Sequence, residues 1–186
     1  MKRIFDLFFS TILFLVLIVP LVVICILIKI DSKGSILFVT ERVGKNKKLF
    51  KMLKFRTMKQ KTPQVHSNEL KNPEKHITLI GKYLRKYSLD ELPQLINIIF
   101  GDMSLVGPRP SLVNQYELID KREIYKIHEL KPGLTGLAQI NGRDNISIDK
   151  KIFFDNQYKL NASFLFDLKI MFKTMKVVFT SRGISH

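Results

Sequence analysis

Residues 7–28 read LFFSTILFLVLIVPLVVICILI, a run of 22 residues that contains no charged side chain. A helix of this length measures about 30 Å, which is the thickness of the hydrocarbon core of a bilayer. The run is longer than the apolar core of a signal peptide, and no small-residue cleavage site follows it. These residues therefore predict a membrane anchor in the N-terminal part of the chain.

Two features bear on how this anchor meets the membrane. Pro20 lies inside the run and predicts a kink, because proline lacks a backbone donor and its ring clashes with the preceding turn. Basic residues flank the run on both sides: Lys2 and Arg3 before it, Lys29 and Lys33 after it. The positive-inside rule therefore draws both ends to the cytoplasm, as a helix that breaks at Pro20 and re-enters the same face allows. A kinked spanning helix stays open, because prolines occur in many spanning helices.

Composition limits the class of protein further. Lys plus Arg number 31 and Asp plus Glu number 16, so the net charge of +15 favours anionic partners: nucleic acid, anionic lipid or phosphorylated substrates. Cys25 is the single cysteine, which excludes an internal disulfide and a cysteine-rich zinc site. The four histidines are scattered without the spacing of metal ligands. A zinc enzyme is therefore not expected.

After the anchor, the chain predicts an α+β domain that is mainly helical, with a small β element and long loops. A β-prone run that follows a Lys-Gly turn predicts a strand at Ser35–Thr40, and a short apolar-basic alternation predicts a second at Phe50–Phe55. Helices are expected over four stretches: Ile77–Tyr87, Leu92–Phe100, Leu112–Leu130 and Phe164–Phe179. Loops are expected at Lys59–Lys75, Gly107–Pro110 and Lys131–Arg143. Because no repeat or long linker divides the chain, we expect an anchor at residues 1–30 and one domain at residues 31–186.

The last predicted helix carries one apolar stripe. Its members recur at three- and four-residue steps: Leu165, Leu168, Phe172, Met175 and Phe179. Three lysines flank the stripe: Lys169, Lys173 and Lys176. Two interpretations follow, a helix that covers the domain core and an interfacial amphipathic helix with its lysines at lipid phosphates.

The stretch Ser88–Leu95 (SLDELPQL) holds the candidate chemistry. Adjacent carboxylates before an apolar helix are often only a cap, and Ser88 with Glu91 matches a capping box. Pro93 argues against that box, because it would stand where an amide should donate. With Asp90 at the cap instead, Pro93 falls in the first turn, and the helix dipole favours an ionised Asp90. An ionised carboxylate is the form that a nucleophile or a metal ligand requires.

Arginines next to glycines, prolines or β-prone segments suggest a phosphate site. Four of them stand out: Arg56, Arg85, Arg109 and Arg143. The planar guanidinium matches phosphate oxygens, and the prolines around Arg109 stiffen its backbone. Any one of these arginines could equally be a solvated side chain in a turn.

Together these stretches strongly resemble the bacterial sugar transferases, the small monotopic phosphoglycosyl transferases. The resemblance rests on Ser88–Asn97 (SLDELPQLIN), Gly101–Pro110 (GDMSLVGPRP) and Lys131–Arg143 (KPGLTGLAQINGR), with Lys54–Met58 (KFRTM) and Phe166–Ile170 (FDLKI) in support. It covers the chain from Lys2 to about Val178. Several long motifs in order make the resemblance specific.

The resemblance implies a reaction and a set of residues. An aspartate attacks the β-phosphate of a UDP-sugar, UMP leaves, and undecaprenyl phosphate, a polyprenol phosphate, then takes the phosphosugar. By position Asp90 is the nucleophile, and Glu91 its partner, either as a Mg²⁺ ligand with Asp90 or as a base toward the acceptor. The implied substrate-binding residues are Lys54, Arg56, Arg109, Pro110, Arg143 and Asp155. Pro20 matches the breaking proline of a re-entrant helix, at the cytoplasmic face of the bacterial inner membrane.

Two rival interpretations remain. A glycosyltransferase would move the sugar without its phosphate and release UDP. A basic membrane-attached protein would bind anionic lipid or RNA without catalysis, but such a patch needs only charge and not stiff Gly-Pro-Arg loops. We therefore expect anionic lipid and no nucleic acid as a partner. The sequence predicts neither the sugar, the glycan pathway nor the oligomeric state.

Overall fold

The computed structural model describes residues 2–60, 62, 73–142 and 145–180, and these residues form a mainly helical α+β fold, as predicted. The helices are α1 (Lys2–Val16), α2 (Ile18–Asp31), α3 (Leu79–Lys86), α4 (Gln94–Phe100), α5 (Tyr116–Ile124), α6 (Leu137–Ile140), α7 (Ile148–Asn161) and α8 (Phe164–Thr180). The strands are β1 (Leu37–Val43), β2 (Leu49–Phe55), β3 (Ser104–Val106), β4 (Ser111–Leu112) and β5 (Gly133–Thr135). Short 3₁₀ turns are η1 (Lys45–Lys47), η3 (Pro73–Lys75), η4 (Leu89–Glu91) and η5 (Ile127–Glu129).

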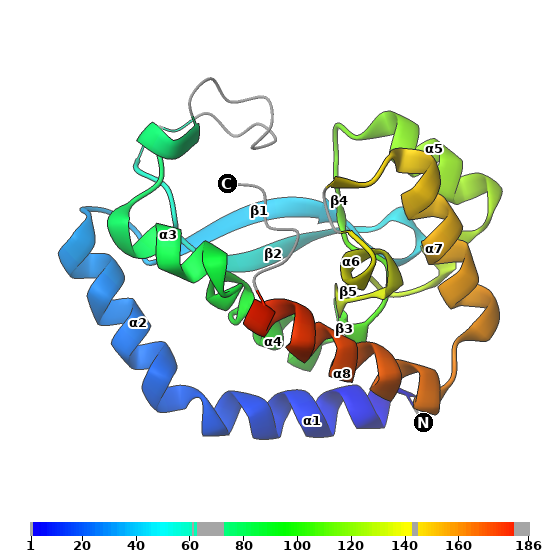
Figure 1. Cartoon of the computed structure of the whole chain (residues 1–186), viewed down its shortest axis with the longest axis horizontal. Coiled ribbons are helices and arrows are strands. Elements are labelled where there is room, and N and C mark those ends of the chain that lie inside the picture. The colour runs from blue at the N-terminus through cyan, green and yellow to red at the C-terminus, as the bar shows by residue number, and fades with distance from the viewer. Residues whose placement is uncertain (1, 61, 63–72, 143–144, 181–186) are drawn as a thin grey trace.

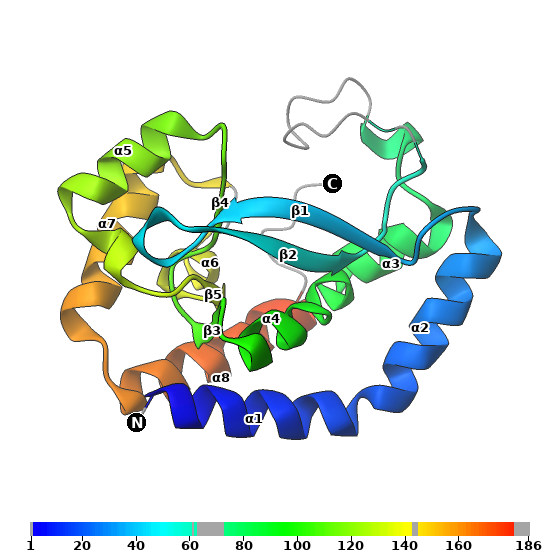
Figure 2. The ribbon, with the colours of Figure 1, turned by 180° about the vertical axis from the view of Figure 1, so that it is seen from behind.

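The elements form a curved molecule around a central hairpin. Figures 1 and 2 show α1 and α2 as a bent pair along the outside, with α4 and α8 between α1 and the β1–β2 hairpin. Helices α5 and α7 lie together at one end of the hairpin, and α3 lies at the other. The site described below is built where these parts meet.

Two small sheets fix the loops between them. Strands β2, β1 and β4 form an antiparallel sheet in that order, with Leu37 opposite Phe55 in the hairpin. Strands β3 and β5 form a parallel pair, with Val106 opposite Thr135. Because parallel strands end at the same edge, the segments that follow Val106 and Thr135 emerge side by side.

Helix α4 links the hairpin to the core. Its side chains Leu95 and Ile98 are fully buried, in a cluster that also contains Met52 of β2. Asn97 covers the outer edge of β2: its Nδ2 donates to the carbonyl of Lys51 at 2.8 Å, and its Oδ1 accepts from the amide of Leu53 at 3.0 Å. An exposed strand edge is thereby paired by a side chain, which holds α4 in register with β2.

The N-terminal helix pair bends at Leu17. The axes of α1 and α2 differ by 61°, and within the described ranges no single helix has the length and hydropathy of a membrane span, which the two helices reach only together. Pro20 lies in the first turn of α2, where its missing amide costs little. The predicted break at Pro20 is thus displaced by three residues, because the proline ring crowds the turn that precedes it.

The start of α1 is fixed to the domain by polar contacts. Lys2 pairs with the buried Asp167 of α8. Arg3 donates to the carbonyls of Ile98 and Ile99 at 2.5 and 2.7 Å, which satisfies the C-terminal end of α4. Asp6 is buried, and its Oδ1 accepts from the amide of Leu105 in β3 at 3.1 Å. Burying a carboxylate requires such a partner, so these contacts fix the position of the N-terminal end of α1 on the domain.

The end of α2 is fixed to the same domain. Oδ2 of Asp31 accepts from the amide of Ile80 in α3 at 3.0 Å. The buried guanidinium of Arg56 donates to the carbonyls of Ser32 and Lys33 at 2.7 and 2.6 Å. Both ends of the bent pair are therefore bonded to one folded unit.

The stripe on α8 faces outward. Leu165, Phe172 and Met175 are 76%, 65% and 50% exposed, whereas Ile170 on the opposite side is buried. Helix α8 therefore covers the domain core through the face of Ile170, as one of the two interpretations expected, while the stripe itself faces outward and the interfacial interpretation stays a prediction.

Some predicted elements differ from the structure. The expected helix Leu112–Leu130 is shorter, because α5 ends at Ile124 and Lys126 adopts a left-handed conformation with φ 52°. Helix α7 was not predicted at all; its charged and apolar residues do not separate into clear faces. Most of the predicted loop Lys59–Lys75 lies outside the described residues.

Candidate active site

Asp90 and Glu91 lie in the 3₁₀ turn η4, between α3 and α4. Ser88 precedes the turn in a left-handed conformation with φ 55° and ψ 22°, and its side chain makes no capping hydrogen bond. The capping-box alternative is therefore wrong. Asp90 does not cap α4 either, because α4 begins at Gln94 with Pro93 before it. A left-handed serine is strained, and such strain is common where a backbone holds functional groups in place.

Cations converge on the two carboxylates. Nζ of Lys54 lies 2.9 Å from Oε1 of Glu91 and 3.9 Å from Oδ2 of Asp90. One guanidinium nitrogen of Arg109 lies 3.2 Å from the same Oε1. The Asp90, Glu91 and Lys54 side chains are only 14%, 10% and 17% exposed. The structure thus brings Lys54, Arg109, Asp90 and Glu91 together from β2, η4 and the loop after β3.

Burial raises the pKa of Asp90 above its ordinary value. Lys54 lowers it, the neighbouring Glu91 carboxylate raises it, and Arg85 and Arg109 lower it by smaller amounts. Because Asp90 does not cap α4, the helix dipole is not what sets its charge, and desolvation outweighs the cations in setting the direction of the pKa shift. A desolvated carboxylate is a stronger nucleophile when ionised than one in water, provided that nearby cations offset its charge.

Glycines let the segment Gly107–Pro110, called the Arg109 loop below, approach β5 and the residue that follows it closely. A Cβ on Gly136 would lie 2.1 Å from the carbonyl oxygen of Gly107, and a Cβ on Gly133 would lie 2.1 Å from its amide nitrogen. Gly107 donates to the carbonyl of Thr135 at 2.9 Å. The irregular segment Gly107–Pro110 was predicted from its prolines, and the structure shows it packed on the segment that follows β5.

The other predicted substrate-binding residues make no such contact with the two carboxylates within the described part of the chain. Arg56 points to the end of α2. Pro110 is buried just before β4. Asp155 lies on α7 with 1% of its surface exposed, and its Oδ2 accepts from the guanidinium of Arg122 at 2.6 and 3.0 Å. Arg143 lies outside the described residues.

Two buried polar residues near the site escaped the sequence reasoning. Arg122 stands four residues after the buried Leu118, and this helical spacing was the available signal. Gln139 of α6 is buried, and neither atom of its amide has a partner among the described residues. Its Oε1 lies 2.6 Å from the position that a Cβ on Gly136 would take, close to Gly107. Nothing in the glycine-rich sequence around it indicated burial.

Asp90 and Glu91 suit a magnesium ion that is shared with a substrate. No cluster of three or more His, Cys, Asp or Glu side chains that could hold a metal occurs within the described ranges. Mg²⁺ needs fewer protein ligands than that, because it is usually bound through one or two carboxylates plus substrate phosphates. Two adjacent carboxylates, beside Lys54 and Arg109, provide such a partial set.

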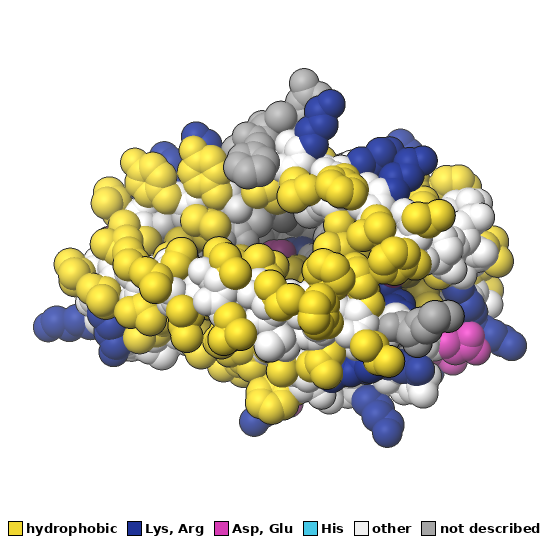
Figure 3. Space-filling model, turned by 90° about the horizontal axis from the view of Figure 1, so that it is seen from below, with side chains coloured by type: hydrophobic (Ala, Val, Ile, Leu, Met, Phe, Trp, Pro, Cys, Tyr) yellow, Lys and Arg dark blue, Asp and Glu magenta, His cyan; other side chains and the backbone are white. Residues whose placement is uncertain are grey.

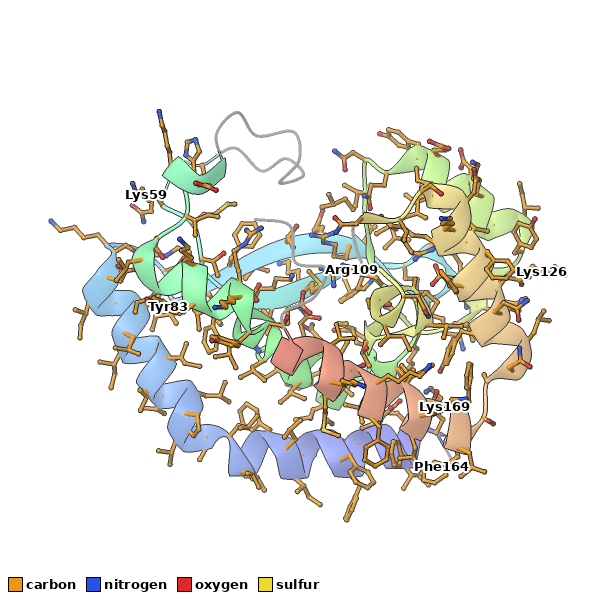
Figure 4. All side chains as sticks on the ribbon, viewed as in Figure 1. Lys59, Tyr83, Arg109, Lys126, Phe164 and Lys169 are labelled. Carbon is orange, nitrogen blue, oxygen red and sulfur yellow. The ribbon has the colours of Figure 1, made fainter. Side chains whose placement is uncertain are left out.

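The candidate site lies within the molecule, and one outer face beside it is apolar. Figure 4 places Arg109 near the centre, between the α3 side that carries Tyr83 and the α8 side that carries Phe164 and Lys169. Figure 3 shows apolar side chains spread over the face formed by the lower helices, with a hollow in which an acidic side chain is visible. Exposed members of this surface on α1 and α2 include Ile4, Phe8, Leu15, Val19 and Ile30.

Comparison with known proteins agrees with the motifs. The family model described as bacterial sugar transferase matches residues 1–181. The chain is 40% identical to the exopolysaccharide production protein ExoY of Rhizobium meliloti, over 98% of this chain and 87% of that protein. It is 37% identical to the undecaprenyl-phosphate galactose phosphotransferase of Salmonella typhimurium, over 98% of this chain and 41% of that protein.

A third relative is the UDP-glucose:undecaprenyl-phosphate glucose-1-phosphate transferase of Klebsiella pneumoniae, 41% identical over 94% of this chain and 39% of that protein. The chain thus spans about two fifths of the length of the Salmonella and Klebsiella proteins, but most of ExoY. The family match covers every element that builds the site. The chain therefore belongs to the bacterial sugar transferase family and is a transferase enzyme.

Proposed function

We propose that this chain transfers a sugar 1-phosphate from a UDP-sugar to a polyprenol phosphate such as undecaprenyl phosphate, releases UMP, and so starts a lipid-linked glycan. The observation that carries the proposal is the largely buried Asp90, set beside Lys54, Glu91 and Arg109 next to an exposed apolar face. The lipid-carrier substrates in the names of the Salmonella and Klebsiella relatives support the same acceptor class.

In the first step, an Oδ atom of Asp90 attacks the β-phosphorus of the donor. The bond between that phosphorus and the bridging oxygen breaks, and UMP leaves with the electron pair. A sugar-phosphoryl-aspartate remains. Lys54 and Arg109 are placed to offset the negative charge of the diphosphate, which an anionic nucleophile must approach.

In the second step, a phosphate oxygen of the acceptor attacks the same phosphorus. The bond to Asp90 breaks, and the carboxylate is regenerated with a polyprenyl-diphosphate-linked sugar as product. A phosphate monoester has a second pKa of about 6, so the acceptor is largely ionised at neutral pH and needs no strong base. Oε1 of Glu91 pairs with Lys54 and Arg109, so we assign Glu91 to holding these two cations and, with Asp90, the metal, and not to deprotonating the acceptor.

Mg²⁺ is the cofactor that we propose for this site. Asp90 and Glu91 would hold it together with the donor diphosphate, and it would neutralise charge on the departing UMP. Binding a cation there also favours the ionised form of Asp90, whose pKa is otherwise raised by burial.

We also propose that the α1–α2 pair is a re-entrant anchor at the cytoplasmic face of the bacterial inner membrane. Both of its ends are bonded to one folded unit, through Arg3 and Asp31 among others. A spanning helix would separate its ends by about 30 Å of hydrocarbon. The outward stripe of α8, with Lys169 and Lys173 beside it, would lie at the interface with anionic headgroups.

The direct test is product analysis with the purified chain, undecaprenyl phosphate and a panel of UDP-sugars with Mg²⁺. UMP release beyond one equivalent that depends on both substrates, and that disappears in Asp90→Asn, supports the proposal. Release of UDP would show a glycosyltransferase instead. Lipid binding without turnover on any donor would favour a non-catalytic basic protein.

A further inference from the structure

Arg122 is a buried arginine that touches the backbone of the Arg109 loop. Its guanidinium donates through Nη1 to the carbonyl oxygen of Arg109 at 2.9 Å. Its Nε and Nη2 donate to Oδ2 of Asp155 at 3.0 and 2.6 Å. The Arg122 side chain is only 6% exposed, so these contacts lie inside the protein between α5, α7 and the loop.

Arg122 bonds the carbonyl of Arg109, and the position of this carbonyl affects the direction of the Arg109 side chain. Pro108 and Pro110 have restricted φ angles, so the loop has few soft torsions apart from those of Arg109 itself. The Arg109 carbonyl belongs to the peptide plane that joins it to Pro110. Fixing this plane fixes ψ of Arg109, and so the direction from which its side chain reaches Glu91 at 3.2 Å.

A buried guanidinium is expensive unless its charge is paired. Asp155 provides that charge through its bonds to Nε and Nη2 of Arg122, while Nη1 of Arg122 donates to the Arg109 carbonyl. A hydrophobic side chain of similar volume would fill the same space without bonding the carbonyl. The arrangement therefore does more than pack α5 against α7.

We propose that Arg122 is a positioning residue, held by Asp155, that aims Arg109 at the reacting phosphate. The proposal rests on the proposed function, because Arg109 has a target only if the site binds a donor diphosphate. It also assigns Asp155 a role behind Arg109, since the Asp155 carboxylate accepts hydrogen bonds from Arg122.

The first experiment is a double-mutant cycle on UMP release. Arg122→Lys keeps the charge but loses the fork that reaches Asp155 and the carbonyl together, and we expect kcat/KM to fall on the order of 100-fold, the scale of a misplacement of about 1 Å. In an Arg109→Met background the same change should cost less than about threefold, because the group that it aims is gone. Lys121→Met, at a half-buried neighbour on α5 whose ammonium pairs with Glu117 and Asp149, is the control and should retain wild-type turnover.

Two further measurements keep the proposal open to refutation if Arg122→Lys is unstable. Arg122 lines a small open pocket together with Pro108. Truncation to alanine vacates the space of the guanidinium group, so millimolar guanidinium should restore part of the turnover of Arg122→Ala, and the same concentration of urea should not. The Arg109 side-chain Nε–H resonance in labelled protein should shift in Arg122→Lys and stay unchanged in Lys121→Met.

Three outcomes would overturn the inference. They are full activity of Arg122→Lys, an equal loss from Arg122→Lys in the wild-type and Arg109→Met backgrounds, and an Arg109 resonance that does not respond. Failure of the proposed function gives a different result, because the wild type would then release no UMP with any UDP-sugar. In that case the Arg109 resonance still decides whether Arg122 positions it.

Discussion

Lys54→Met tests the electrostatic design of the site. In the wild type, Nζ of Lys54 is placed between Glu91 at 2.9 Å and Asp90 at 3.9 Å, in surroundings where all three side chains are less than one-fifth exposed. Methionine keeps most of the stem volume and removes the charge. Two neighbouring buried carboxylates are then left with Arg85 and Arg109 as their cations.

The magnitude follows from the distances. At an effective dielectric constant of about 20, the attraction of the Lys54 ammonium group is about 6 kcal/mol to Glu91 at 2.9 Å and about 4 kcal/mol to Asp90 at 3.9 Å. Desolvation of the ammonium group offsets much of this in the wild type, and Arg109 remains in the variant. Breaking a buried pair costs about 3–5 kcal/mol, so with residual exposure we expect a loss near the lower end, about 2–3 kcal/mol in the free energy of unfolding at pH 8.

The assay is urea unfolding of the full chain in detergent at pH 8 and at stepwise lower pH. Without Lys54 the pKa of Asp90 rises further, because Lys54 is the largest influence that lowers it. A group whose pKa is higher in the folded state than in the unfolded state stabilises the fold at pH values below its unfolded pKa. This contribution is lost as the pH rises through its folded pKa. The difference in the free energy of unfolding between Lys54→Met and the wild type should therefore be largest at pH 8 and become smaller as the pH falls.

Lys51→Met is the matched control, since it removes the same charge from an exposed side chain on the same strand. Its unfolding free energy should stay within about 0.5 kcal/mol of wild type. Equal losses for both variants, or a Lys54→Met loss that does not depend on pH, would refute the reasoning.

Three further predictions follow from the structure. Asp90→Asn should abolish UMP release yet raise the melting temperature at pH 8, because it removes a carboxylate whose pKa burial raises. This gain in melting temperature should vanish below the unfolded pKa of Asp90, and a lower melting temperature of the variant at pH 8 would contradict the prediction. Gly136→Ala should reduce kcat/KM at least tenfold, because its Cβ would lie 2.1 Å from the Gly107 carbonyl and displace the loop; wild-type kinetics would contradict this packing. Cysteines introduced at Lys2 and Lys33 in a Cys25→Ser background should react with an impermeant thiol reagent from the same side of inside-out vesicles, and labelling from opposite sides would exclude a re-entrant anchor.

The sequence predicted best those features that local residue patterns determine. The apolar run gave the N-terminal helices, alternation gave β1 and β2, and the two prolines gave the irregular Gly107–Pro110 segment. Four site residues from distant positions in the chain, Lys54, Asp90, Glu91 and Arg109, do meet in the structure. Their meeting was implied by resemblance to a family, and local spacing could not have given it.

The features that the sequence did not predict depend on tertiary contacts. The pKa of Asp90 is raised because packing removes water, and no local motif reports how much. The bend at Leu17 is three residues before Pro20, since the strain of a proline falls on the turn before it. Arg122 falls within the predicted helix Leu112–Leu130, and its burial depends on its contacts with Asp155 and Arg109, which are distant in the sequence.

The most direct test of the account is to look for the covalent intermediate on Asp90. The purified chain is incubated with Mg²⁺ and a UDP-sugar without acceptor, quenched in acid, digested and analysed by mass spectrometry, with Asp90→Asn and Glu91→Gln in parallel. We predict a phosphosugar adduct on the peptide that contains Asp90, formed with one equivalent of UMP, absent from Asp90→Asn and discharged by undecaprenyl phosphate. UMP release in the presence of acceptor without any adduct, or by Asp90→Asn at the wild-type rate, would contradict Asp90 as the nucleophile.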